Sequence, residues 1–310
     1  AACDWSSDVC SSDLLRSESK IMDGWDNNKP LVSVLCLTYN HASFIEDAIC
    51  GFLKQSTKYP FQIVFHDDAS TDKTQELILG YKKKYPRIIK LVFQDVNIYS
   101  CAGNVLSHGM TSCDGKYIAF CEGDDYWVDS TKLQEQVDFL ENNLTYSVVY
   151  SDCQPFDEFG DVAFDYRGVR RDLSADQMKE SPSIYTLTSC FRNIITVPPE
   201  AAMAKYGDLF IWSLLGHHGK GKYLPTERPS RYRVHSAGLH SKSSRSARVD
   251  MSISTYAALM SYYKRVGNSE LASFFRKKLL DVCTREWIRY LPGGEAIYWL
   301  RSKMRLIFKD

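Results

Sequence analysis

Several features that would point at once to a function are missing from this sequence. Its 310 residues carry 38 basic and 38 acidic side chains, so no excess of one sign indicates a nucleic acid or an acidic partner. No apolar run reaches the roughly 18 residues that a membrane-spanning helix needs, and no secretory signal pattern is visible. What remains is a chain with 44% hydrophobic residues, enough for one large domain with an appendage or for two domains.

Paired cysteines are also missing. None of the ten cysteines forms a CxxC pair, which argues against a zinc site. Cys36, Cys50, Cys121 and Cys190 lie in apolar stretches, as buried free thiols do. This usage indicates a reducing compartment, so we expect a cytoplasmic protein, with peripheral contact at the inner face of the plasma membrane as an option.

The glycine-rich loops that cradle phosphate are absent as well. Neither GxxxxGK[ST] nor GxGxxG occurs in the chain. A ligand that carries a diphosphate would therefore need another counter-charge, and a metal ion is the natural one.

The first residues differ from the rest of the chain. Residues 4–14, DWSSDVCSSDL, resemble the translation of a sequencing-adapter oligonucleotide, with a Ser/Asp-rich disordered tail as the alternative. We therefore expect an artefactual or disordered tail over residues 1–29. A catalytic or binding domain is expected over residues 30–245, and a helical extension over residues 246–310.

From residue 31 onward, short apolar runs alternate with segments of helical spacing. Strands are predicted over residues 31–37, 61–65, 88–93 and 116–121, with helices over about 42–54, 71–84 and 104–110 between them. Shorter strands over residues 146–150, 222–224 and 231–234, a helix near 209–215 and a helical region from about residue 248 follow. This order is typical of an α/β protein with a mostly parallel sheet flanked by helices on both faces.

Polar side chains follow three of the predicted strands. Parallel sheets bind ligands beyond the carboxyl ends of their strands, and those ends share one edge of the sheet. We therefore expect three groups to converge although they are far apart in sequence: Thr38 to Asn40, Asp67 with Asp68, and Glu122 to Asp125.

The third group is the most acidic. Glu122, Asp124 and Asp125 lie within four positions after an apolar strand, where like charges repel and burial is costly. A bound Mg²⁺ or Mn²⁺ would remove that conflict, usually together with substrate phosphates. The alternative is a solvated turn, but Tyr126 and Trp127 follow directly, and an exposed turn seldom carries two large aromatic residues.

The first two groups suit a nucleotide. Asp67 or Asp68 could accept a hydrogen bond from a base N–H or a ribose hydroxyl, and Tyr39 and Asn40 could contact a base by stacking and hydrogen bonding. The alternatives are a helix-capping acid for Asp67 and Asp68, and a turn Asn beside a core Tyr.

Read in order, three segments resemble the family 2 glycosyltransferases with the GT-A (Rossmann-like) fold. They are LVSVLCLTYNHASFIEDAICGFLKQS, FHDDASTDKT and GKYIAFCEGDDYWVDSTKLQEQVDFL. The resemblance extends from Pro30 to Ser241, where GDLFIWSLL and YRVHSAGLHS look like the acceptor half of that family. It implies a metal-dependent, inverting transfer of a sugar from a UDP- or dTDP-linked donor to a glycan or lipid-linked acceptor in bacterial surface polysaccharide assembly.

The resemblance, with the reasoning above, also implies roles for single residues. Nucleotide-sugar ligands are expected at Leu37, Thr38, Tyr39, Asn40, Asp67, Asp68 and Asp124. Metal ligands are expected at Asp125, Asp124, Glu122 and His235. The family usually has Asp where this chain has Glu122, so Glu122 could act through a water molecule. For His235, and for Arg233 as a source of positive charge, a structural role is the alternative.

Asp208 matches the acidic general base of that family. It begins a predicted helix, whose dipole favours the charged carboxylate, whereas a buried acceptor pocket would raise its pKa. An ordinary acid in the first turn of a helix is the alternative. Asp157, Asp161 and Asp165 compete for the role, and the sequence does not place them.

Two further readings stay open. A nucleotidyltransferase also combines a parallel sheet with Mg²⁺, but it typically carries a Gly-rich basic signature that LTYNHASF lacks. A sugar-nucleotide-binding module without catalysis is the other, and the intact acidic set argues against it. Residues 295–310, EAIYWLRSKMRLIFKD, could lie on an anionic membrane surface, although we favour a helical layer packed on the catalytic domain.

Overall fold

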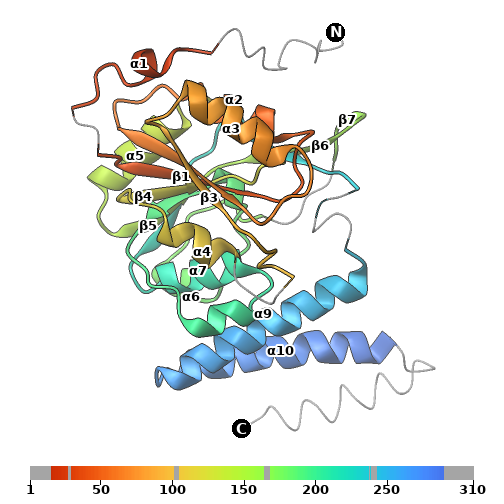
Figure 1. Ribbon diagram of the computed structural model, residues 1–310. Coiled ribbons are helices and arrows are strands. Elements are labelled where there is room, and N and C mark those ends of the chain that lie inside the picture. The colour runs from red at the N-terminus through yellow and green to blue at the C-terminus, as the bar shows by residue number, and fades with distance from the viewer. Residues whose placement is uncertain are drawn as a thin grey trace.

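The computed structural model describes residues 15–26, 29–100, 105–163, 168–236, 238 and 243–289 (Figure 1). Expectations from the sequence that concern residues 4–14, residues 295–310 and Asp165 lie outside these ranges.

The strands are β1 (Val32–Thr38), β2 (Phe61–Asp67), β3 (Ile89–Phe93), β4 (Tyr117–Phe120), β5 (Tyr146–Tyr150), β6 (Cys153–Asp157), β7 (Gly160–Asp161), β8 (Cys190–Arg192), β9 (Lys220–Tyr223) and β10 (Ser230–Arg233). The helices are α1 (Glu18–Ile21), α2 (Ile45–Leu53), α3 (Thr74–Lys84), α4 (Val105–Thr111), α5 (Lys132–Asn142), α6 (Ala175–Lys179), α7 (Gly207–Leu215), α9 (Arg245–Arg265) and α10 (Ser269–Arg289), with 3-10 helices η3 (Thr186–Thr188) and η4 (Pro199–Met203).

A seven-stranded sheet in the order β3-β2-β1-β4-β8-β5-β9 forms the centre of the molecule. β1 pairs in parallel with β2 and β4, and its last residue, Thr38, lies beside Asp67 at the end of β2. β8 runs antiparallel to both β4 and β5, an insertion that the sequence pattern did not predict. The prediction of an α/β protein with a mostly parallel central sheet is confirmed.

Both faces of the sheet are covered, which explains why β1 is mostly apolar. Val32, Val34 and Cys36 pack on one side with residues of α2, α3 and α5. Leu35 points to the other side, among residues of α4, α6 and α7. Successive side chains of a strand alternate between faces, so a strand buried on both faces favours apolar residues along its whole length. The buried Ser33 is the exception inside β1, and its hydroxyl oxygen accepts a bond from the Gly115 amide at 2.9 Å.

Helix α2 packs directly behind residues 122–125, called the acidic segment from here on. Ile45, Ala48, Ile49 and Phe52 follow helical spacing and are fully buried. Gly51 lies on the same helix, and a Cβ at this position would lie 2.7 Å from the carbonyl oxygen of Trp127. Because only glycine permits this approach, α2 fixes the chain just beyond Asp125.

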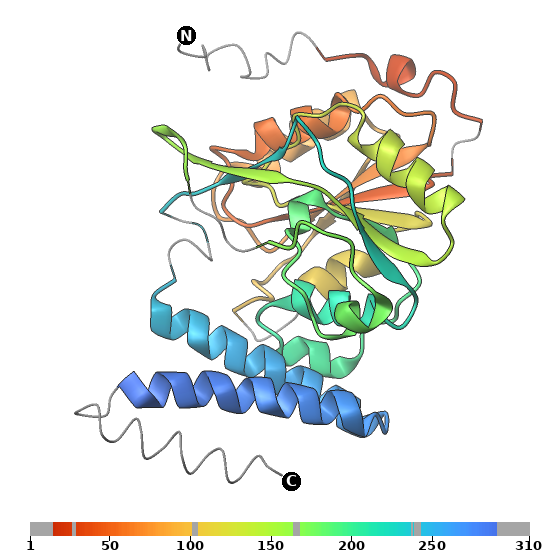
Figure 2. The same ribbon diagram turned by 180° about the vertical axis from the view of Figure 1, so that it is seen from behind.

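The C-terminal helices α9 and α10 form a layer beneath α7 (Figures 1 and 2). Their cluster contains Leu259, Tyr263 and Phe275, packed against Phe210 and Leu214 of α7. The expectation of a helical C-terminal extension is confirmed for the described residues up to 289, and residues 290–310 lie outside the described ranges. No helix among the described residues is long and apolar enough to cross a membrane.

A smaller three-stranded sheet in the order β10-β6-β7 lies beside the main one. An antiparallel bridge between Tyr126 and Arg231 connects it to the acidic segment. This bridge brings Arg233 and His235, more than a hundred residues further along the chain, next to Asp124 and Asp125.

The cysteine expectations are confirmed at three of four positions. Cys36, Cys121 and Cys190 are buried and free. Cys50 is disulfide-bonded, so the expectation of a free thiol at this position is wrong.

Candidate active site

The expected convergence of the three polar groups occurs at the carboxyl edge of the main sheet. Backbone hydrogen bonds continue past the strand ends: the Gly123 amide donates to the Leu37 carbonyl at 3.0 Å, and the Asp68 amide donates to the Thr38 carbonyl at 2.9 Å. The loops after β1, β2 and β4 are therefore held side by side.

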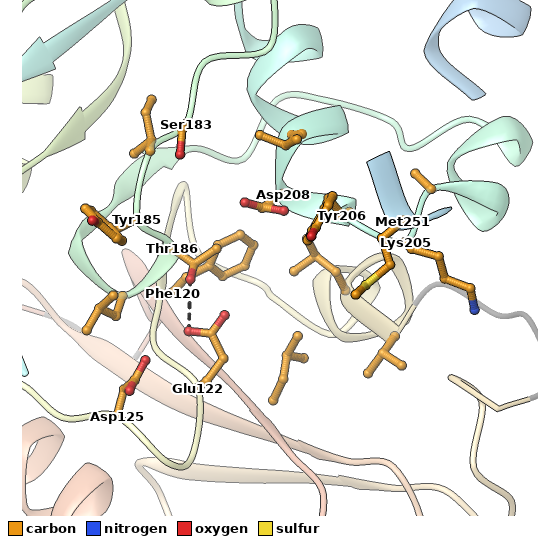
Figure 3. A pocket seen from close by; sticks show the side chains of 18 of the residues that line it. Phe120, Glu122, Asp125, Ser183, Tyr185, Thr186, Lys205, Tyr206, Asp208 and Met251 are labelled. Atoms are coloured by element: carbon orange, nitrogen blue, oxygen red, sulfur yellow. Dashed lines mark hydrogen bonds between the residues drawn. The ribbon is translucent and has the colours of Figure 1, made fainter. Parts of the chain in front are cut away.

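A cavity of about 1170 Å³ opens at this edge, large enough for a nucleotide-sized ligand and a second molecule. Two groups of residues line it. The strand end comprises Leu37, Thr38, Tyr39, Asp68, Glu122, Asp124 and Asp125. The helix end comprises Tyr185, Lys205, Tyr206, Asp208, Met251 and Tyr256. Figure 3 shows Asp208 facing Glu122 across the cavity, with Asp125 on the same side as Glu122.

Asp125 is the most deeply buried acid of residues 122–125. It is only 3% exposed, and the Arg233 amide donates to its Oδ1 atom at 2.7 Å. Burial raises the pKa of Asp125 well above its usual value, and the neighbouring Asp124 and Glu122 raise it further. The backbone amide and guanidinium of Arg233 oppose this rise, but the negative charge at this point remains incompletely balanced.

Asp124 is the better compensated acid. Its Oδ2 atom lies 3.0 Å from His235 Nε2 and 3.7 Å from His41 Nε2. Burial raises the pKa of Asp124, but the two histidines outweigh it, so that the pKa is lowered overall. His235, expected as a metal ligand, thus contacts Asp124 directly, and His41 is a neighbour that the sequence reasoning missed.

Glu122 connects the two ends of the cavity. The Thr186 hydroxyl donates to its Oε2 atom at 3.0 Å, the bond drawn in Figure 3. Burial raises the pKa of Glu122 to about 7, with further contributions from Asp124 and from Asp208. The carboxylate of Asp208 thus contributes a smaller part of the rise in the pKa of Glu122.

Asp208 lies in the first turn of α7, as predicted, and lines the cavity. Burial raises its pKa to about 6, while backbone amides of its own turn hold it from rising further. Two of its rivals are engaged elsewhere: Asp161 pairs with Arg231 at 2.6 Å, and the carboxylate of Asp157 accepts a bond from the Phe159 amide at 2.8 Å. Neither lines the cavity.

Leu37, Thr38 and Tyr39 all line the cavity, and the Tyr39 side chain is 44% exposed there. An exposed aromatic ring at the mouth of a cavity is free to stack on a flat ligand. All three are thus open to a ligand in the cavity, and their role as nucleotide ligands stays a prediction.

Asn40 and Asp67, also expected as nucleotide ligands, do not line the cavity. Asn40 adopts a left-handed φ of 56°, which Asn tolerates, and its Oδ1 atom accepts a bond from the Thr71 amide at 2.8 Å. Asp67 is fully buried and accepts bonds from Thr38 Oγ1 at 2.8 Å and from Gln75 Nε2 at 2.6 Å. Both residues hold the flanking loops together.

Asp68 does line the cavity, but its carboxylate already has partners. The amides of Ile98 and Tyr99 donate to its two oxygen atoms at 2.7 and 3.0 Å. Tyr99 also lines the cavity, and Lys205 of the helix end lies 4.6 Å from its ring centroid. Asp68 therefore holds a segment that borders both ends. The sequence carried no signal for this segment.

The acids suit a cation that arrives with its ligand. Among the described residues, no group of three or more His, Cys, Asp or Glu side chains is placed to hold a metal ion by itself. Magnesium-type ions commonly bind through one or two carboxylates and complete their shell with substrate phosphates and water. Asp125 and Asp124, crowded and facing the cavity, fit that pattern.

Solved structures with a similar fold support this reading of the architecture. One is Staphylococcus aureus TarS (residues 1–349) in complex with UDP-GlcNAc, which superposes with a TM-score of 0.55 at 16% identity. The match covers 79% of this chain and 71% of that chain. Another is the mannosyltransferase PcManGT from Pyrobaculum calidifontis in complex with GDP-Man and Mn²⁺, which superposes with a TM-score of 0.50 at 15% identity. The match covers 94% of this chain and 86% of that chain. At such identities the likeness shows a shared fold.

Sequence relatives are more similar but match over a shorter stretch. An uncharacterized protein of Mycobacterium tuberculosis is 33% identical over 163 residues, which are 52% of this chain and 46% of the relative. Bacillus subtilis TuaG, named for teichuronic acid biosynthesis, is 33% identical over 139 residues, 43% and 53% of the two chains. The chain spans about half the length of these curated relatives.

The sequence model of Glycosyl transferase family 2 matches residues 33–193, slightly more than half of the chain. This stretch contains β1, β2 and β4 and the three polar groups that follow them. It is also the part of the chain that carries the strand end of the cavity. The chain belongs to glycosyltransferase family 2.

Proposed function

We propose that this protein transfers a sugar from a nucleotide-diphosphate donor to an acceptor hydroxyl, with inversion at the anomeric carbon and with Mg²⁺ or Mn²⁺. The observation that carries the proposal is the placement of Asp208 opposite Glu122 and Asp125 across one cavity, which Asp124 also lines. A sugar between the two ends has its leaving group toward the acids and its free face toward Asp208.

This arrangement suits a single displacement. The acceptor oxygen forms a bond to the anomeric carbon while the bond from that carbon to the diphosphate oxygen breaks. Asp208 takes the proton of the acceptor hydroxyl, and the nucleoside diphosphate leaves with the bonding electron pair. A carboxylate whose pKa is raised to about 6 is charged at neutral pH yet more basic than an ordinary Asp. Attack opposite the leaving group inverts the configuration.

Asp125 and Asp124 would hold the cation. When bound, it neutralises the charge that develops on the diphosphate. Arg233 lies nearby, and His41 and His235 hold Asp124 in its charged form, so the acid keeps its place as a ligand.

The donor and acceptor classes are part of the proposal. We place the base near Tyr39, with the ribose and diphosphate toward Asp68 and Asp124. We propose a UDP- or dTDP-linked donor, and TarS, crystallised with UDP-GlcNAc, supports that choice on a shared fold. A glycan or lipid-linked acceptor in bacterial surface polysaccharide assembly is supported by the name of the relative TuaG.

A donor screen tests the proposal. The protein is incubated with UDP-, dTDP- and GDP-linked sugars and Mn²⁺, with and without a chelator, and nucleoside diphosphate release is followed by mass spectrometry. We expect release with one donor class, loss of release with chelator, and an inverted product by NMR. Nucleotide binding without release from any donor would contradict the proposal and favour a binding module.

A further inference from the structure

The N-terminal end of α2 lies against the last residue of β10 and the residues that follow it. One Arg233 terminal nitrogen, Nη2, lies 2.6 Å from Asp47 Oδ2. The guanidinium carbon lies 4.7 Å from the ring centroid of Phe44, and the His235 ring makes an edge contact with the same ring at 4.6 Å. Phe44 and Asp47 thus support both residues that reach the acidic segment from β10.

Arg233 in turn contacts both adjacent acids. Its backbone amide donates to Asp125 Oδ1 at 2.7 Å, and its Nε donates to the backbone carbonyl of Asp124 at 2.9 Å. Phe156 covers the guanidinium at 4.6 Å, and the Arg233 side chain is 16% exposed. One arginine therefore fixes a side chain and a backbone position of the acidic segment.

The direction of the guanidinium decides whether the acids stay free for a ligand. A guanidinium fork fits a carboxylate well, and the Asp124 and Asp125 carboxylates are close by. The Asp47 carboxylate occupies the outer nitrogen, so the fork turns away from them and bonds a carbonyl oxygen instead. Without Asp47, Arg233 would be drawn to the carboxylates that should receive the cation and diphosphate.

We propose that Asp47 is a positioning residue, which acts through Arg233 to keep Asp124 and Asp125 placed and available for the diphosphate and its cation. The inference rests on the proposed function. Asp47 lies outside the three polar groups and does not line the cavity, so it touches neither donor nor acceptor.

Metal binding tests this inference independently of turnover. Mn²⁺ binding in the presence of UDP, with dTDP and GDP in parallel, is measured from the free-Mn²⁺ electron paramagnetic resonance signal. We expect Asp47→Ala to weaken Mn²⁺ binding about tenfold, as supporting residues of metal sites commonly do, and Asp47→Glu to restore most of it. Glu46→Gln is the matched control: it removes an acid from the same turn, whose partner is the Tyr81 hydroxyl at 3.0 Å, and should bind as wild type does.

A double-variant cycle separates a path through Arg233 from a general loss of structure. Arg233→Ala alone and combined with Asp47→Ala should bind Mn²⁺ equally within twofold, because Asp47 acts only through Arg233. If Arg233→Ala does not fold, Arg233→Gln, which keeps much of the side chain without its charge, takes its place with the same expectation. Additive losses, or wild-type binding by Asp47→Ala, would overturn the positioning role alone. If wild type binds Mn²⁺ with none of the three nucleotides, the proposed function fails and this inference fails with it.

Discussion

The two ends of the cavity both hold buried acids, but they differ in what surrounds those acids. At the strand end, three acids crowd together, and burial and mutual repulsion raise the pKa of Asp125 although Arg233 opposes the rise. At the helix end, Asp208 faces the cavity with backbone amides of its own turn, and burial raises its pKa to about 6. The first end holds negative charge that a cation would relieve, and the second makes a carboxylate more basic. Under the proposed function, one half of the cavity would bind the charged diphosphate and its cation, and the other half would accept the proton.

Removing the charge of Asp125 should have the largest effect on turnover. We expect Asp125→Asn to lower turnover by a factor on the order of 10⁴, since several kcal/mol of leaving-group stabilisation would be lost. The amide fills the same space without a charge, so the thermal midpoint without metal should not fall. Steady-state rates check the turnover, and calorimetry checks the thermal midpoint. A variant that keeps its activity would contradict the proposed role of the strand end.

Asp208→Asn should have the next largest effect, and of a different kind. Turnover should fall by a factor on the order of 10³, because the acceptor hydroxyl loses its base. Binding of UDP with Mn²⁺, measured by titration calorimetry, should stay within about threefold of wild type since the strand end is intact. A large loss of nucleotide binding would show that the two ends are not separable.

The pH profile, compared between wild type and Asp208→Asn, tests the role of Asp208. Asp208, with a pKa of about 6, must be charged to accept a proton, so turnover should fall below pH 6 by about tenfold per unit. The folded pKa lies above the unfolded value of about 3.9, so the stability contributed by the neutral acid is complete below pH 3.9 and is lost as pH rises through 6. Asp208→Asn should therefore show a flat rate profile and a relative gain in thermal midpoint between pH 4 and 6. A wild-type rate that stays constant to pH 5 would contradict the assignment.

Asp161→Asn should have the smallest effect and serves as the control for rival acids. Its side chain is 41% exposed and pairs with Arg231 outside the cavity. We expect turnover within twofold of wild type and a change of about 1 kcal/mol or less in the free energy of unfolding, measured by urea titration. A turnover loss as large as that of Asp208→Asn would instead identify Asp161, in the smaller sheet, as the general base.

The strand end was largely predictable from the sequence, and the reasons are local. β1 and β2 are apolar runs with a polar break, and a parallel sheet brings such breaks to one edge. Which side chain in a break faces the cavity was not predictable. Asn40 and Asp67 turned out to tie loops, because a single φ of 56° and a few hydrogen bonds decide that direction.

The helix end was much harder to predict. Asp208 was found only through a resemblance, and nothing in the spacing separated it from Asp161 or tied it to Met251 and Tyr256. The antiparallel β8 was missed as well, since three residues are too few for a periodic signal. The contact of Asp47 with Arg233 joins residues 186 positions apart, which no local pattern indicates.

By itself, the sequence determined the parallel strands β1 to β4 with the helices between them and the acidic segment that follows β4, because hydrophobic period and strand ends are properties of neighbouring residues. Only the tertiary structure decided which acids share a cavity and which hold loops. Those choices depend on burial and on partners brought together from distant segments, and burial is what raises the pKa of Asp208 and crowds Asp125.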